Sequence, residues 1–149
     1  MSMGSTLIDL SRGVPGINAP DPTSYDEYWP YYVSQHLHPV TRRAHVAGTT
    51  GAIALGVAAA VTLNPLPLLA APAVGYGVAW VSHFTVEKNK PATFGNPLWA
   101  LRSDFRQVWK FAARRLEGDV QAVRRAIGMR PEHRTLAEAG AAEPSPLAA

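Results

Sequence analysis

A long stretch in the middle of this chain carries no charged residue. Between Val46 and Val86 there is no Asp, Glu, Lys or Arg, and the stretch is interrupted in its middle by Asn64-Pro65-Leu66-Pro67. Two prolines in such a short segment break a helix. The sequence therefore predicts a helical hairpin, with two apolar helices at about 46–63 and 66–86.

The length of the two arms is compatible with a membrane. An arm of about 18 to 20 residues spans the ~30 Å hydrocarbon core of a bilayer at a rise of 1.5 Å per residue. The alternative is that the arms form the buried core of a soluble bundle, because Gly and Ala dominate them. Small residues let two helices approach closely in either setting, so they do not separate the two interpretations.

The basic residues next to the hairpin predict its orientation. Arg42 and Arg43 precede the first arm, and Lys88 and Lys90 follow the second. A two-span hairpin places both pairs on one side of the bilayer, which by the positive-inside rule is the cytoplasm. We therefore expect a membrane location with both termini cytoplasmic, and the composition, rich in Ala, Arg and Pro, favours a bacterial inner membrane.

Composition limits the chemistry. Only 17% of the residues are charged, below the roughly 25% of typical soluble domains. Cysteine is absent, which excludes disulfides, thiolate metal ligands and cysteine nucleophiles. The net charge of +3 suggests an anionic partner. No recognisable nucleic-acid-binding module accompanies this charge, so we expect no nucleic-acid partner. The first residues do not have the pattern of a secretory signal.

The rest of the chain is organised around the hairpin as a single all-α domain. We expect a flexible leader at 1–23, a helical domain at 24–130 and a disordered tail at 131–149. Ser24 can cap an aromatic helix that ends before His38-Pro39. Pro30 predicts a late start or a kink in that helix.

A second flanking helix is predicted at about 97–127. Its apolar residues recur at helical spacing, with basic residues between them. It is therefore a basic amphipathic helix. It is typical either of a helix that lies on anionic headgroups or of an ordinary solvated surface.

Four histidines can meet at the base of the hairpin: His36, His38, His45 and His83. His83 and Glu87 are four residues apart, so one helix would hold both on the same face. An antiparallel hairpin would bring His45 next to them, and the turn at Pro39 would bring His36. Two or three imidazoles with one carboxylate suit non-haem ferrous iron, and zinc is chemically possible too. His133 lies in the polar tail and is expected to be inert.

Two ordered motifs resemble one known family. The first is Tyr32-Val33-Ser34-Gln35-His36-Leu37-His38-Pro39, followed by Arg42-Arg43-Ala44-His45 and Gly48-Thr49. The second is Gly75-Tyr76-Gly77-Val78-Ala79-Trp80-Val81-Ser82-His83-Phe84, followed by Glu87-Lys88-Asn89-Lys90-Pro91-Ala92-Thr93-Phe94 and Pro97-Leu98-Trp99. With the apolar stretch between them, these motifs are similar to those of the 2-hydroxy-fatty-acid dioxygenases. The similarity covers about residues 25–118.

The resemblance implies an enzyme that uses Fe(II) and dioxygen to shorten a 2-hydroxy fatty acid by one carbon. It implies that the ligands are His36, His45, His83 and Glu87, with His38 outside the set. The substrate would be a membrane lipid or fatty acid, whose carboxylate basic residues can attract (Arg42, Arg43, Lys88 and Lys90). Two departures stand out: Thr41 replaces an expected Asn, and the arms are rich in Ala and Gly. A haem-binding or lipid-binding membrane scaffold is the alternative.

Overall fold

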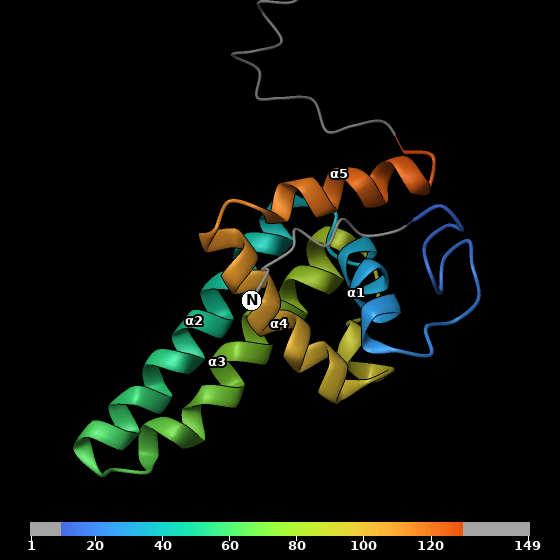
Figure 1. The fold of residues 1–149 in the computed structure, drawn as a ribbon. Helices are drawn as coiled ribbons and strands as arrows, with labels where there is room; N and C mark the ends of the chain where they lie inside the picture. Colours follow the sequence, from blue (N-terminus) through green and yellow to red (C-terminus); the bar gives the residue numbers. More distant parts are fainter. Residues whose placement is uncertain (1–9, 130–149) are drawn as a thin grey trace, which may run out of the picture.

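The computed structural model describes residues 10–129, and the regular elements within this range are all helices (Figure 1). The predicted tail at 131–149 lies outside the described residues, and so do residues 1–9 and His133. In chain order the elements are α1 (Tyr25–Ser34), α2 (Pro39–Thr62), α3 (Leu66–Ser82), a π-helical turn η1 (His83–Glu87), a 3-10 turn η2 (Ala92–Phe94), α4 (Pro97–Ala112) and α5 (Leu116–Ala126). The all-α prediction is confirmed for this range.

The apolar stretch forms two antiparallel helices, α2 and α3, that project from the rest of the molecule as an arm (Figure 1). α2 begins earlier than predicted, because Pro39 occupies its first turn and the His38 side chain accepts a hydrogen bond from the Val40 N–H. It ends at Thr62, and the following residue, Leu63, adopts a left-handed conformation with a φ of 52°.

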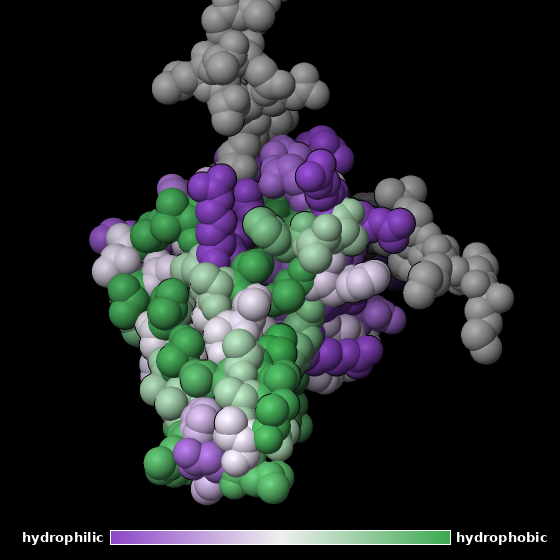
Figure 2. Space-filling model, turned by 90° about the vertical axis from the view of Figure 1, so that its left-hand side faces the viewer, coloured by the Kyte–Doolittle hydropathy of each residue, from purple (hydrophilic) through white to green (hydrophobic). Residues whose placement is uncertain are grey.

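One of the two arms meets the requirements of a membrane span. α2 has 24 residues, and 17% of its most apolar 18-residue window is buried. Hydrophobic side chains cover most of the hairpin face shown in Figure 2. α3 has 17 residues and contains Pro72, and it is followed by η1 rather than by a continuous helix to Val86. The prediction of two spanning helices is thus supported for α2 alone.

Gly48 sets the closest approach of the two arms. A Cβ atom placed on Gly48 would lie 2.8 Å from the carbonyl oxygen of Gly75, closer than a side chain can approach a rigid backbone. Gly56, further along α2, has open space at the same position, with nothing within 4 Å. The small residue is therefore required at Gly48 by packing and is not required at Gly56.

This difference gives a matched pair of substitutions. We expect Gly48→Ala to destabilise the protein by about 1–3 kcal/mol, because the added methyl group overpacks the helix contact. Gly56→Ala should be neutral or stabilise by up to about 1 kcal/mol, because Ala has the higher helix propensity. Thermal unfolding of both variants in the same detergent would measure this, and equal melting temperatures would contradict the close approach.

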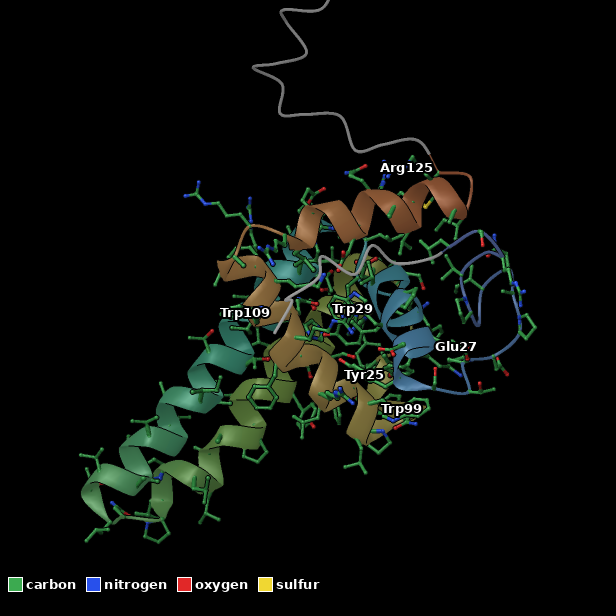
Figure 3. All side chains as sticks on the ribbon, in the orientation of Figure 1. Tyr25, Glu27, Trp29, Trp99, Trp109 and Arg125 are labelled. Atoms are coloured by element: carbon green, nitrogen blue, oxygen red, sulfur yellow. The ribbon has the colours of Figure 1, made fainter. Side chains whose placement is uncertain are left out.

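The hydrophobic core lies at the other end of the molecule, where α1 packs on α5. Trp29 of α1 lies close to α4 and α5 (Figure 3), and its indole N–H donates to Asp119 of α5 at 2.8 Å. The described part of the predicted leader joins this core. Val14 is fully buried in this core. Its backbone N–H donates to the Asn18 side chain, which stabilises the turn that directs Val14 inward. α1 begins at Tyr25 with Ser24 as its cap, so the late start expected from Pro30 is not observed.

The predicted single helix at 97–127 is wrong. The chain forms two helices there, α4 and α5, separated at residues 113–115, where Arg114 has a φ of 55°. The apolar residues of α4 do not face the core: Leu98, Phe105 and Trp109 are exposed, whereas the buried side of α4 is small or polar. The spacing of the apolar residues predicted which of them share one side of α4, but it did not predict the direction in which that side points.

Candidate metal centre

Three buried histidine side chains from three elements converge at the base of the hairpin. His36 follows α1, His45 lies in the second turn of α2, and His83 opens η1. Their exposed fractions are 1%, 6% and 1%. The Nε2 atom of His45 lies 3.2 Å from Nε2 of His36 and 3.0 Å from Nε2 of His83. The predicted meeting of these three histidines is therefore present in the structure, with a geometry that could hold a metal ion.

The Nδ1 atom of each ring faces a group that can only accept a hydrogen bond. His36 Nδ1 lies 2.6 Å from the Tyr32 carbonyl oxygen, and His45 Nδ1 lies 2.9 Å from the Asp104 carboxylate. His83 Nδ1 lies 2.7 Å from Oδ1 of Asn89. The orientation of the Asn89 amide is fixed because its Nδ2 donates to the carbonyl oxygen of Gln35 at 3.0 Å. All three rings must therefore carry their proton on Nδ1.

This tautomer leaves three lone pairs pointing at one another. A neutral imidazole has a single N–H, so none of the Nε2 atoms can donate to its neighbours. Burial lowers the pKa of His36 well below its usual value and also lowers that of His83, which keeps both rings neutral near pH 7. His45 lies between the other two rings, so a single proton on its Nε2 could serve one of the two short contacts and not both. A cation between the rings completes both.

The spacing agrees with a shared ion. Bonds of about 2.0–2.1 Å from an ion to imidazole nitrogen, at angles of about 90° to 110°, put the nitrogens ~2.8 to 3.4 Å apart. The two Nε2 separations, 3.2 and 3.0 Å, fall in this range. The donor set of three neutral imidazoles fits a divalent transition metal, and three ligands leave further coordination positions open.

Asp104 is the residue that sequence reasoning missed. It comes from α4, and its Oδ1 accepts both from His45 Nδ1 and from the Tyr32 hydroxyl, the latter at 2.5 Å. Burial raises the pKa of Tyr32 well above its usual value, so the phenol remains a donor. A carboxylate behind a ligating imidazole orients the ring and raises its basicity. The available signal was that Asp104 is the single acidic residue of α4.

Tyr32 supports two of the three histidines. Its ring stacks on His36 with centroids 4.0 Å apart, and its carbonyl accepts the Nδ1 proton of the same ring. Its hydroxyl holds Asp104 and lies 3.4 Å from His45 Nδ1. Tyr32 and Asn89 both lie inside the motifs singled out in the sequence, but nothing in the spacing distinguishes them from their neighbours.

Glu87 is brought to the edge of this cluster and not into it. Its carboxylate accepts a hydrogen bond from the backbone N–H of His38 at 2.7 Å, and it is absent from the group of side chains that could share an ion. The predicted half-site of His83 and Glu87 assumed an α-helix. The chain instead forms the π-helical turn η1, which ends at Glu87 and is followed by Lys88 with a φ of 59°. The direct ligand role of Glu87 stays a prediction.

The basic residues predicted to attract substrate have different environments. Arg42 is 6% exposed, and its guanidinium donates to the carbonyl oxygens of His36 and Leu37 and pairs with Glu117 at 3.2 Å. It thus holds the segment that carries His36. Three other basic side chains are on the surface: Arg43, Lys88 and Lys90. The His38 side chain caps α2 and takes no part in the cluster. Thr41 is fully buried, and its hydroxyl has no hydrogen-bond partner.

An all-helical fold with a buried three-histidine cluster defines a class of protein that can hold a metal ion at the base of an apolar hairpin. A comparison with known protein families identifies the family within this class. The family described as 2-hydroxy-palmitic acid dioxygenase Mpo1-like matches residues 22–116, and the chain belongs to it. This confirms the resemblance noted in the sequence. Neither the curated proteins nor the solved structures contain a match.

The pH dependence of stability follows from the lowered pKa values. For His36 and His83 the pKa in the folded protein is below the unfolded value of about 6.5, so the unfolded chain takes up protons first as pH falls. The stability of the metal-free protein should be complete above about pH 6.5 and should decrease as the pH falls below it. Melting temperatures between pH 8 and 5 would measure this, and His36→Gln should show a smaller decrease. An equal slope in that variant would contradict the assignment.

Asp104 provides a test of the support behind His45. Asp104→Asn keeps an acceptor but removes the charge, and Asp104→Ala leaves the buried Nδ1–H of His45 without a partner. We expect metal affinity to fall by about 10- to 100-fold for supporting groups of this kind, with the larger loss for Ala. Titration with Co(II), followed by its absorbance, would measure this.

The matched control is Asp119→Asn. Asp119 also accepts from a buried aromatic donor and pairs with a lysine, but it does not contact the histidines. Its substitution should leave the affinity for Co(II) unchanged. A comparable loss in both variants would mean that Asp104 acts through general stability and not through His45.

Proposed function

We propose that this protein is an Fe(II)-dependent dioxygenase that carries out α-oxidation of a 2-hydroxy fatty acid, giving an acid one carbon shorter. The observation that carries the proposal is the convergence of three buried imidazole rings, with Nε2 of His45 3.2 Å from Nε2 of His36 and 3.0 Å from Nε2 of His83. All three histidines lie within the part of the chain that matches the dioxygenase family. The name of that family supplies the substrate class.

The reaction balances without a further reductant. One 2-hydroxy acid and one dioxygen give the shortened acid, carbon dioxide and water. The bond between C1 and C2 breaks, and the α-carbon passes from alcohol to carboxylic acid. The four electrons that leave the two carbons reduce one dioxygen completely. Iron, when bound, supplies the one-electron chemistry that lets dioxygen react with such a substrate, which zinc cannot do.

The residues of the chain hold and isolate the site. Tyr32, Asp104 and Asn89 keep the three Nδ1 protons in place, so that the Nε2 atoms remain available as ligands. The three rings are almost completely buried, which limits access of water to the chemistry. Glu87, whose direct ligand role stays a prediction, also has a positioning role, since its bond to the His38 amide ties η1 to the segment that carries His36.

Substrate binding would use the open metal positions and the hairpin. The carboxylate and the 2-hydroxyl of the substrate can chelate the ion, which orients the α-carbon. Surface residues Arg43, Lys88 and Lys90 would attract the carboxylate, and the acyl chain would lie along the apolar hairpin. We propose that the hairpin sits in a membrane with both of its flanking ends on the cytoplasmic side, a location that the length and hydropathy of α2 support.

The geometry does not favour the haem alternative. Two axial imidazoles on one haem iron would have their nitrogens on opposite sides, about 4 Å apart, with the porphyrin between them. The Nε2 atoms of His45 and His83 are 3.0 Å apart, and the third ring adjoins both. This close grouping suits one small ion held on one side by three rings, and does not suit two rings on opposite sides of a macrocycle.

The decisive experiment combines metal analysis with an oxygen assay. We expect the protein purified without oxygen to bind close to one Fe(II), and to consume dioxygen when a long-chain 2-hydroxy fatty acid is added. His83→Ala should lose both properties, because it removes a ligand. His38→Ala is the matched control and should keep both, because His38 lies outside the cluster.

The substrate control is the same fatty acid without its 2-hydroxyl, which should give no uptake because it lacks one of the two chelating oxygens. Mass spectrometry of the product should show the acid one carbon shorter. A protein that stays inert after reconstitution with Fe(II), or an activity that survives His83→Ala, would refute the proposal.

A further inference from the structure

We propose that α4 is an interfacial helix that lies in the plane of a lipid bilayer, with its outer face at the boundary between headgroups and acyl chains. The outer face is the set Leu98, Leu101, Phe105 and Trp109. This goes beyond the hairpin as a membrane segment, because it fixes the depth of the histidine cluster relative to the lipid. It does not depend on the identity of the metal or of the reaction.

The first observation is that the polarity of α4 is inverted. Its outer-face residues recur at intervals of three and four, which places them along one side of the helix. Their exposed fractions are 76%, 42%, 49% and 64% in chain order. The buried side consists of Ala100, Ser103, Asp104 and Gln107. A helix on a water-exposed surface has the opposite arrangement.

The buried polar side of α4 is fully used by the interior. Asp104 binds His45 and Tyr32, Ser103 bonds with the Tyr25 hydroxyl, and Gln107 donates to the carbonyl oxygen of Arg42 at 3.0 Å. The helix therefore cannot rotate to bury its apolar side without breaking these bonds. The exposed apolar face is a fixed feature of the fold, and it needs a partner that is apolar.

The second observation is the position of α4 on the molecule. In Figure 1, α4 runs across the base of the hairpin and not along it, and it packs on α2. If the hairpin enters a bilayer, a helix that crosses its base lies close to the membrane plane. Further exposed aromatic residues, Phe84 and Phe94, come from the segments between α3 and α4. The apolar surface thus extends from the hairpin to α4.

The charges favour lipid over a second copy of the chain. Arg102 is exposed beside the outer face, and its guanidinium lies 3.7 Å from the Tyr25 ring centroid, so it stays at the edge of the apolar surface. Arg114 and Arg115 are exposed just after α4 ends. Two copies joined through this face would bring like charges together in a chain of net charge +3. Anionic headgroups complement the same residues, as in other interfacial helices.

This position of α4 would let a lipid substrate reach the histidine cluster from within the membrane. Asp104 on the inner side of α4 contacts His45 directly, so the cluster is separated from the outer face by about one helix diameter, ~10 Å. A fatty acid whose carboxylate lies at the headgroup level would then be at the depth of the cluster. It would not have to leave the membrane to bind.

The absence of cysteine makes a direct test possible, because a single introduced cysteine can be labelled without ambiguity. We would attach an environment-sensitive NBD fluorophore to full-length Phe105→Cys and insert the protein into phosphatidylcholine vesicles that contain phosphatidylglycerol. Val57→Cys, at an exposed position within the hairpin and away from its turn, is the lipid reference. Arg125→Cys, on the outer side of α5 (Figure 3), is the water reference.

We expect the emission of the Phe105 label to shift to the blue and to be quenched by nitroxide-bearing lipid, while the Arg125 label stays open to iodide. Leu101→Cys tests the same face if Phe105→Cys does not fold. Labels at both outer-face positions that remain open to iodide would refute the proposal. Labels shielded from both quenchers would also refute it and would point to a protein partner. Neither readout involves metal or substrate, so failure here leaves the proposed reaction untouched.

Discussion

Three buried imidazole rings meet at the base of the hairpin with their Nε2 atoms facing one another. The lone pairs of nitrogen atoms that face one another at 3.0 and 3.2 Å repel each other unless a positive charge lies between them. Each ring is held in this arrangement from behind, by Tyr32, Asp104 and Asn89. These supports come from α1, from α4 and from the turn after α3. The cluster therefore fixes how segments distant in the sequence meet.

The same requirement explains the unusual polarity of α4. Its inner side must present a carboxylate to His45 and an amide to the backbone of α2. Because that side is committed to polar contacts, the apolar residues of the helix are left on the outside. Contact of such an apolar face with water is unfavourable, whereas contact with lipid is favourable. The face therefore suits a molecule whose hairpin is also apolar.

The features that could be predicted from the sequence were those with a long or regular signal. The charge-free stretch indicated the hairpin, and the motifs around His36, His45 and His83 indicated which side chains would meet. Three features could not be predicted, because each depends on tertiary contacts: the π-helical turn that takes Glu87 to His38, the break at Arg114, and the inward direction of Asp104. Periodicity reports which residues share a face and not which way that face points.

The supports of the cluster also couple metal binding to the base of the hairpin. Asn89 joins His83 to the carbonyl oxygen of Gln35, and Arg42 joins the His36 segment to α2 and α5. An ion bound by the three rings would therefore stabilise the contacts between the arm and the core as well as the cluster itself, since binding to the folded state alone adds to its stability. The repulsion among the lone pairs is relieved at the same step. The site and the junction that positions α4 on the hairpin would thus form one cooperative unit.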